Sequence, residues 1–368
     1  MFFIFKTTLF LLFFLYFLLL LRLWGGLRKL KTCSGNNLEP VSVIVAMKNE
    51  EKNVRQCLDS LINQNYPRNL LEIFIIDDGS TDKTSLILDE YNRKNTFVSV
   101  LKIDSSEPIH RGKKNALTRT IKKSNGKILL FTDADCVPQK NWVRSMTSCF
   151  DSKVGLVVGF SPLIDPSNSL FGNILKIDSL AAGIVAAGSI GLNKAVTCTG
   201  RNLAYRREVF DQINGFEKIM NSISGDDDLF LQLVKKKTNW ETRYATQIES
   251  IVPSFQTKSF TGFFRQKRRH LSAGKYYNFK VQIGYFLFHL ANLCFFLFLL
   301  FSVFSGKFLL ISFSLFLSKL IVDWILLKAG CLIFSMVFTF STFLFWEVFF
   351  LFYHLVIGPV SWIGKIKW

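Results

Sequence analysis

The sequence predicts an α/β protein with a mainly parallel sheet covered by helices on both faces, joined to transmembrane helices near both ends of the chain. Hydrophobic residues make up 49% of the 368 residues and 39 residues are Phe, which exceeds what one soluble core of this size uses. Between these apolar ends, β-branched runs alternate with segments of helical periodicity. That alternation is typical of a parallel sheet.

The first apolar run covers residues 2–21 and carries one charge, Lys6. About twenty apolar residues suffice to span a bilayer. The basic sequence RLWGGLRKLK follows, with no small-residue cleavage site, so we expect an uncleaved anchor over residues 1–24. A secretory signal peptide is the alternative.

Apolar character returns at the C-terminal end, and residues 281–368 are predicted to form a transmembrane region with spans near 282–304, 308–328 and 331–357. Basic residues flank the first and second apolar runs on their inner sides: Arg22, Arg28, Lys29, Lys31, Lys275 and Lys280. The positive-inside rule then places residues 28–280 in the cytoplasm of a multi-pass membrane protein, which we expect in a bacterial inner membrane.

The number of C-terminal spans stays open in the sequence. Three complete spans would leave Lys365 and Lys367 outside, against the positive-inside rule. Lys319 and Asp323 mark either an interfacial break or a paired polar site.

The net charge of +18 is not accompanied by a nucleic-acid-binding motif, so anionic lipid and a phosphorylated ligand are the expected partners, and nucleic acid is not. The seven cysteines form no CxxC pair. Their spacing predicts free thiols in a reducing compartment and no zinc site.

The central region repeats a strand followed by a helix four times. Strands are predicted at 41–47, 71–78, 98–103 and 127–135, and the segment after each one has helical character. Ligands bind such sheets beyond the carboxyl ends of the strands.

Two of these strands end in paired acids, at Asp77 with Asp78 and at Asp133 with Asp135. The DGSTDKT sequence after Asp77 is also compatible with a simple turn and helix cap. For Asp133 and Asp135 a metal site is favoured, because both carboxylates of a D-x-D at a strand end can approach one hard cation. Mg²⁺ or Mn²⁺ shared with a diphosphate fits such oxygen ligands.

Seven motifs then follow in an order that resembles the family 2 inverting glycosyltransferases with a GT-A fold: VSVIVAMKNEE, IIDDGSTDKT, GKKNAL, FTDADC, TGRNLAYRREVF, SGDDDLFLQL and RQKRRH. The resemblance covers about residues 40–275, with the GT-A domain over 40–256. It implies a nucleotide-sugar site made of Asn49, Glu50, Asp77, Asp78, Lys113 and Asp133, and a metal site made of Asp133 and Asp135.

The SGDDD motif is predicted to supply the catalytic base. In the family, apolar residues stand five and seven positions after this aspartate. Leu231 and Leu233 stand at these positions relative to Asp226, which is therefore selected as the base that removes the acceptor's proton. Asp227 remains an alternative. Gly225 stands where the family usually has Glu. Acids at the start of a helix are also favoured by the helix dipole, which is the structural explanation for Asp227 and Asp228.

Residues 257–280 are predicted to form an interfacial amphipathic segment. Gln266, Arg269 and His270 resemble the family's Gln-x-x-Arg-Trp motif, which closes over the diphosphate and acceptor. His270 replaces the Trp and so disfavours processive polymer synthesis. A basic helix that binds anionic lipid is an equally compatible interpretation.

His289, Glu347 and His354 lie in apolar spans, where ionisable residues are candidates for function. The sequence names no partner for them.

The predicted function is transfer of a sugar, with inversion, from a nucleotide-sugar donor to a lipid or lipid-linked saccharide. Two other enzyme classes remain, a processive polysaccharide synthase and a polyprenyl-phosphate sugar synthase. The non-enzymatic alternative is a degenerate membrane scaffold or lipid-binding protein, which is disfavoured because all three acidic sites are kept.

Overall fold

A computed structural model describes residues 2–35, 38–103, 112–222, 224–256 and 259–362. Its centre is a seven-stranded sheet with the order β3-β2-β1-β4-β7-β5-β8. The strands are β1 Val41–Met47, β2 Leu71–Asp77, β3 Val98–Lys102, β4 Ile128–Asp133, β5 Val154–Gly159, β7 Leu203–Arg206 and β8 Glu241–Ala245. A second, two-stranded parallel sheet joins β6 Leu163–Ile164 to β9 Ser254–Phe255.

The mainly parallel sheet is confirmed. β1 pairs in parallel with β2 and β4, β2 with β3, and β5 with β8, while β7 runs antiparallel to both β4 and β5. The register places Met47 beside Asp77 and Ala46 beside Asp133. The carboxyl ends of β1, β2 and β4 therefore meet at one edge.

Helices cover both faces of the sheet. They are α2 Val54–Ile62, α3 Thr84–Lys94, α4 Lys113–Lys123, α5 Trp142–Thr147, α7 Arg207–Gln212 and α8 Asp228–Lys237. Successive residues of β1 enter different cores, since Ile44 belongs to one buried cluster and Val43 and Val45 to the other. A strand buried on both faces explains why VSVIVAM is a continuous apolar run without alternation.

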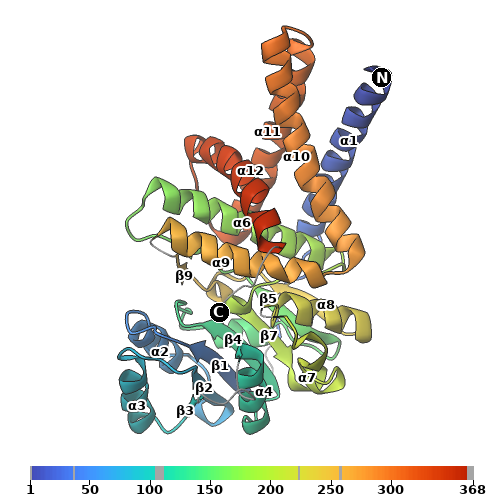
Figure 1. Ribbon diagram of the computed structural model, residues 1–368. Helices are drawn as coiled ribbons and strands as arrows, with labels where there is room; N and C mark the ends of the chain where they lie inside the picture. The colour runs from blue at the N-terminus through green and yellow to red at the C-terminus, as the bar shows by residue number, and fades with distance from the viewer. Residues whose placement is uncertain (1, 36–37, 104–111, 223, 257–258, 363–368) are drawn as a thin grey trace.

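Among the described residues, five helices are long and apolar enough to cross a membrane, which indicates a membrane protein. They are α1 Phe2–Leu27, α6 Leu170–Gly191, α10 Phe279–Ser305, α11 Leu309–Phe334 and α12 Phe340–Trp362. Figure 1 shows α1, α10 and α11 rising away from the sheet, whereas α6 and α9 (Phe260–Ser272) run across it.

α6 was not predicted from the sequence. Its apolar window is 72% buried, against 22% for α1, because the sheet lies on one side of α6 and the other apolar helices lie on the other. The chain enters α6 from the β6 region and returns to β7 in the main sheet. α6 therefore packs in the core of the protein.

The predicted break near residues 328–330 is wrong, because α11 continues through Lys-Ala-Gly to Phe334 and the break falls at 335–339. Gly330 lets the Ile184 side chain of α6 approach, since an added Cβ would lie 2.4 Å from Ile184 Cδ1. Lys365, Lys367 and the first two residues of the predicted interfacial segment 257–280 lie outside the described residues.

The prediction of free thiols is wrong for one pair. Cys33 and Cys149 form a disulfide with an Sγ–Sγ distance of 2.06 Å, although 116 residues separate them in the sequence. The segment after α1 runs along the end of α5, where Gly35 N donates to Ser148 O at 2.9 Å. Sequence spacing could not show this contact, because it depends on how the linker packs.

Candidate active site

The ends of β1 and β2 are joined by side-chain hydrogen bonds. Asn49 adopts a left-handed conformation with φ of 56°, and its Oδ1 accepts from Thr81 N at 2.8 Å. Its own N–H donates to Ser80 Oγ at 3.0 Å. Asp77 is buried and accepts from Ser80 N at 2.9 Å. Asp78 lies 3.9 Å from Lys48 Nζ. Asn49, Asp77 and Asp78 therefore share one loop-lined edge, as predicted.

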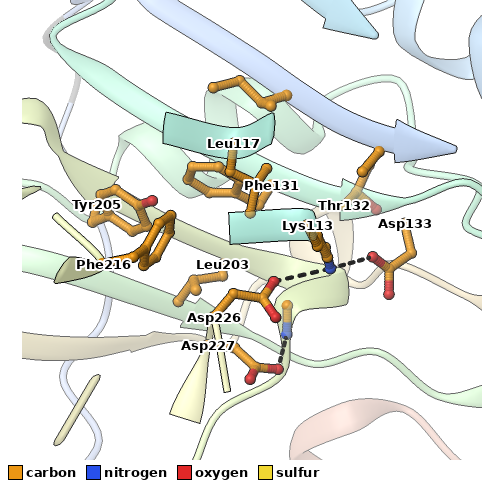
Figure 2. A pocket seen from close by; sticks show the side chains of 13 residues that line it. Lys113, Leu117, Phe131, Thr132, Asp133, Leu203, Tyr205, Phe216, Asp226 and Asp227 are labelled. Atoms are coloured by element: carbon orange, nitrogen blue, oxygen red, sulfur yellow. Dashed lines mark hydrogen bonds and ion pairs between the residues drawn. The ribbon is translucent and has the colours of Figure 1, made fainter. Parts of the chain in front are cut away.

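Lys113 lies at the centre of the neighbouring pocket (Figure 2). It is the first residue of α4, and its Nζ lies 2.9 Å from Asp226 Oδ2 and 3.4 Å from Asp133 Oδ1. Two acidic motifs that are about ninety residues apart in the sequence thus meet at one ammonium group. Thr132 and Gly200 complete the wall next to them.

Electrostatics hold this ion pair in its charged form. Burial by itself lowers the pKa of Lys113, but attraction to Asp133 and Asp226 outweighs it and the net pKa is raised. Burial alone would raise the pKa of Asp226, but Lys113 more than compensates and the net pKa is lowered. Asp226 is therefore ionised at neutral pH and presents a carboxylate to the pocket.

The carboxylates of Asp227 and Asp228 are used by the protein itself. Asp227 Oδ2 accepts from Gly200 N at 2.8 Å, and its Oδ1 accepts from Asp228 N at 2.7 Å as the N-cap of α8. Asp228 Oδ1 accepts from Thr197 Oγ1 at 2.8 Å and from Cys198 N at 2.7 Å, and its Oδ2 accepts from the Tyr277 hydroxyl. Asp228 therefore does more than support the helix start.

Gly225 has a conformational reason for replacing the family's Glu. Its φ is 88°, which L-residues rarely adopt, and an added Cβ would lie 2.5 Å from Leu229 Cγ. A side chain at this position would collide with the first turn of α8.

Asp133, Asp135 and Glu50 crowd together beyond β4. Burial raises the pKa of Asp135, and the negative charge of Asp133 raises it further, with Arg201 opposing. Burial also raises the pKa of Glu50, where Asp135 and Asp133 add to the effect against a hydrogen bond from Asn53. Mutual repulsion among hard oxygen ligands is what a divalent cation relieves, so these residues fit Mg²⁺ or Mn²⁺.

Among the residues that the structure describes, no group of three or more His, Cys, Asp or Glu side chains is arranged to hold a metal ion by itself. Mg²⁺ usually takes one or two protein carboxylates together with substrate phosphate oxygens and waters. Two aspartates are thus a sufficient protein contribution when a diphosphate supplies the other ligands.

The predicted Gln266, Arg269 and His270 all lie on α9, which crosses the sheet side of the apolar helices (Figure 1). Desolvation lowers the pKa of His270, and the positive charges of its neighbours on α9 and of Arg201 and Lys113 lower it further. His270 is exposed on α9 and lies within electrostatic reach of the Lys113 pocket. Gln266 is half-buried on the same helix.

Comparisons with known proteins agree with this arrangement. Residues 42–213 match the family described as "Glycosyl transferase family 2", and residues 128–361 match "Glycosyl transferase family group 2", which is more than half of the chain. The chain is a family 2 glycosyltransferase. The match ends at residue 361 in α12, so α10 and α11 and nearly all of α12 belong to the family pattern as well.

Two curated relatives illustrate the similarity. The chain is 27% identical to the probable glycosyltransferase YdaM of Bacillus subtilis (strain 168), over 72% of this chain and 69% of that protein. It is 36% identical to the beta-monoglucosyldiacylglycerol synthase of Nostoc sp. (strain PCC 7120), over 57% of this chain and 44% of that protein.

Among solved structures, the mannosyltransferase PcManGT from Pyrobaculum calidifontis, in complex with GDP-Man and Mn²⁺, is similar in fold. It has a TM-score of 0.64 at 16% identity and covers 95% of both chains. This likeness confirms the GT-A fold of the glycosyltransferase.

Several residues around the site of this glycosyltransferase were not predicted from the sequence. Thr132 Oγ1 donates to Arg201 O at 2.9 Å, which brings the Arg201 backbone beside β4. Lys114 Nζ donates to Ser222 O and to Ser224 O and so holds the segment that leads into Asp226. The only available signal was the basic residue in each of the TGRN and GKKNAL motifs, and neither motif says where its cation points.

Proposed function

We propose that this glycosyltransferase moves one sugar, with inversion, from a nucleotide-sugar donor to a lipid or lipid-linked saccharide at the membrane surface. The observation that carries the proposal is the contact of Lys113 Nζ with both Asp133 and Asp226. This contact supports one pocket in which the donor's diphosphate side and the catalytic carboxylate lie next to each other.

The chemistry follows from these positions. Asp226 takes the proton of the acceptor hydroxyl, and the acceptor oxygen forms a bond to the anomeric carbon on the face opposite the diphosphate. The bond between that carbon and the diphosphate oxygen breaks, and the electron pair leaves with the nucleoside diphosphate. Lys113 supplies positive charge where negative charge develops on the departing group.

Asn49, Glu50, Asp77 and Asp78 are assigned to the nucleotide side of the pocket, since they line the ends of β1 and β2. Gln266, Arg269 and His270 are assigned to the diphosphate and acceptor side, because α9 lies between the pocket and the apolar helices. Because His270 has no large apolar face for stacking against a sugar chain, single transfer is favoured over processive synthesis.

Asp133 and Asp135 are assigned as protein ligands of Mg²⁺ or Mn²⁺. The cation, when bound, neutralises charge on the leaving diphosphate. PcManGT was solved with Mn²⁺ and GDP-Man, which agrees with this assignment without testing it for this chain.

Asp135→Ala should abolish transfer and Mn²⁺-dependent nucleotide binding and leave the fold intact. Full activity in excess EDTA would contradict the metal assignment.

The lipid acceptor is proposed from the position of the pocket beneath membrane helices. The Nostoc relative is named beta-monoglucosyldiacylglycerol synthase, and this name agrees with a lipid acceptor. Purified protein in detergent should consume one nucleotide sugar from a panel of uridine, guanosine and thymidine diphosphate sugars. Offering diacylglycerol, polyprenyl phosphate and lipid-linked saccharide in parallel then identifies the acceptor.

Product size separates the alternatives in the same assay. A lipid with a single added sugar supports the proposal, a long polymer indicates a processive synthase, and a sugar on polyprenyl phosphate indicates a polyprenyl-phosphate sugar synthase. No nucleotide-sugar consumption by the wild-type protein, with Asp226→Asn as the matched control, would contradict enzymatic function.

A further inference from the structure

α12 is long and apolar enough to cross a membrane, with 23 residues and a length of about 34 Å against a hydrocarbon core of about 30 Å. Its contacts, however, place its C-terminal end at the catalytic domain and its start beside the lower half of α11. We propose that α12 is a re-entrant helix that enters and leaves the bilayer on the catalytic-domain side, with its exposed face in the acyl chains of that leaflet.

The end of α11 fixes the point from which the chain starts toward α12. The Phe334 ring stacks on Phe160 with 4.3 Å between ring centroids, and its centroid lies 5.7 Å from that of Tyr244 on β8. Phe160 directly follows β5, and both partners are buried in the catalytic domain. α11 therefore completes its crossing and ends at the catalytic domain.

The start of α12 is limited by its short connection to α11. Five residues, 335–339, separate α11 from α12, so Phe334 and Phe340 can be at most about 22 Å apart even if the segment is fully extended. The segment turns back along α11, because Lys328 Nζ lies 3.5 Å from Phe338 O and the ring centroids of Trp324 and Phe340 are 5.3 Å apart. α12 thus begins beside the lower half of α11 and not at the far surface.

The C-terminal end of α12 is tied to the two helices that lie across the sheet. Arg268 Nε on α9 donates to Val360 O at 3.2 Å. The Tyr353 hydroxyl donates to Asp178 Oδ1 on α6 at 2.8 Å, and Lys267 of α9 pairs with the other oxygen of Asp178. Figure 1 shows α12 leaning across the bundle toward α9, while α10 and α11 extend beyond it.

One face of α12 is covered by protein and the other is open and apolar. Phe345, Val348, Phe352 and Val356 are each more than half exposed, at 52–55%, and recur at helical spacing. The opposite face contains Trp346, Tyr353 and Ile357, all at least nine-tenths buried. The open face carries no charge and continues the exposed apolar surface of α10 and α11, so acyl chains are the partner that its chemistry fits.

This arrangement removes the conflict that the sequence left open. If α1, α10 and α11 cross the membrane and α12 does not, the chain leaves α12 on the same side as the catalytic domain. Lys365 and Lys367 then follow on the side that also carries the basic flanks of α1 and α10. The inference uses no transferase activity, so its test is independent of the proposed function.

The test places a short epitope in the full chain at three positions: after Lys94 in the catalytic domain, after Lys307 between α10 and α11, and after Trp368. Antibody access is measured in sealed right-side-out and inverted vesicles. We expect the epitopes after Lys94 and Trp368 to be accessible in one vesicle type and the epitope after Lys307 in the other. Access at Trp368 together with Lys307 would overturn the proposal.

If the epitope after Lys307 prevents expression, Lys307→Cys labelled with a membrane-impermeant maleimide replaces it, with the unmodified chain as the background. A second measurement addresses the leaflet. A spin label is attached at Val348→Cys. We expect lipid-soluble oxygen to increase the relaxation rate of the label, and an aqueous nickel complex to leave that rate unchanged. A relaxation rate that only the aqueous nickel complex increases would mean that this face of α12 does not contact acyl chains.

Discussion

At the residue scale, Asp226 and Asp227 are neighbours whose carboxylates have different tasks. Asp226 faces Lys113 across the pocket, whereas both oxygens of Asp227 accept backbone N–H groups. Asp226→Asn keeps the shape of the side chain but cannot accept a proton, so we expect kcat to fall by about 10² to 10⁴ with little change in donor affinity. Turnover and nucleotide binding measured side by side check this prediction.

Asp227→Asn is the matched comparison. The amide can accept only through its one oxygen, so one of the N–H groups of Gly200 and Asp228 loses its partner, at a cost of about 1–3 kcal/mol in stability. We therefore expect a lower melting temperature with residual turnover. Near-normal turnover in Asp226→Asn beside a folded but inactive Asp227→Asn would show that Asp227 is the base.

Lys113 sets the pH range over which Asp226 can act. Attraction to Lys113 outweighs burial and lowers the pKa of Asp226, so the proposed base stays ionised below neutral pH. Lys113→Met removes this cation and should raise the pKa of Asp226. The acidic limb of the kcat profile should therefore move to higher pH in Lys113→Met and stay in place in Lys113→Arg. An acidic limb at the same pH in both variants would contradict this role.

At the element scale, the anchor α1 docks on α6 through glycines. An added Cβ on Gly26 would lie 2.0 Å from Gly188 O, whereas one on the neighbouring Gly25 would meet nothing within 4 Å. Alanine favours a helix over glycine at both positions, so propensity alone predicts no loss. We expect Gly26→Ala to cost about 1–3 kcal/mol through overpacking, and Gly25→Ala to be neutral or stabilising.

The melting temperatures of Gly26→Ala and Gly25→Ala are measured in detergent by size-exclusion chromatography after heating. The two variants are matched, because the same substitution is made at adjacent positions of one helix. Equal melting temperatures would mean that the close approach of α1 to α6 is not part of the stable fold.

The elements that sequence analysis predicted are those with a local signal. β1 is a β-branched run followed by an amphipathic segment, and it lies at Val41–Met47 as predicted. α6 has a local signal as well, 22 residues with a mean hydropathy of 1.5, but an apolar helix covered by protein and one covered by lipid have the same composition. β7 runs antiparallel between β4 and β5, and only long-range pairing decides that direction.

In the candidate site, too, the residues with a motif were predicted, and those that depend on the path of an irregular segment were not. The resemblance to the family assigned Asp133 and Lys113 to the donor site and Asp226 to the base, and in the structure Lys113 contacts both carboxylates. The disulfide of Cys33 and the backbone contacts of Lys114 depend on the paths of irregular segments, which have no periodic pattern to interpret.

At the scale of the whole molecule, two features favour opposite compartments for the catalytic domain. The basic flanks of α1 favour the cytoplasm, whereas the Cys33–Cys149 disulfide is typical of an oxidising compartment. From the basic residues that flank α1, we expect a reporter inserted within residues 90–95 to be cytoplasmic. A periplasmic or lumenal signal there, with Cys33 and Cys149 protected from alkylation until reduced, would reverse the orientation.

A buried ionic cluster joins α1, α11 and α12 into one bundle. Lys319 Nζ lies 2.9 Å from Asp323 Oδ2 and contacts Glu347, while the Tyr16 hydroxyl donates to Asp323 Oδ1 at 2.6 Å. The side chains of Lys319, Asp323 and Glu347 are at most 10% exposed. Lys319 therefore compensates two carboxylates that are buried with it.

Removing that lysine should be far more harmful than removing an exposed one. Lys319→Met leaves two buried carboxylates without a cation, and breaking a buried pair in this way costs about 3–5 kcal/mol. We expect Lys319→Met to lose its folded peak on size-exclusion chromatography, while Lys307→Met at the helix connection behaves like the wild type. Adding Glu347→Gln to Lys319→Met removes one of the two unpaired charges and should restore part of the stability. A double variant no more stable than Lys319→Met would mean that charge compensation is not what holds the three helices together.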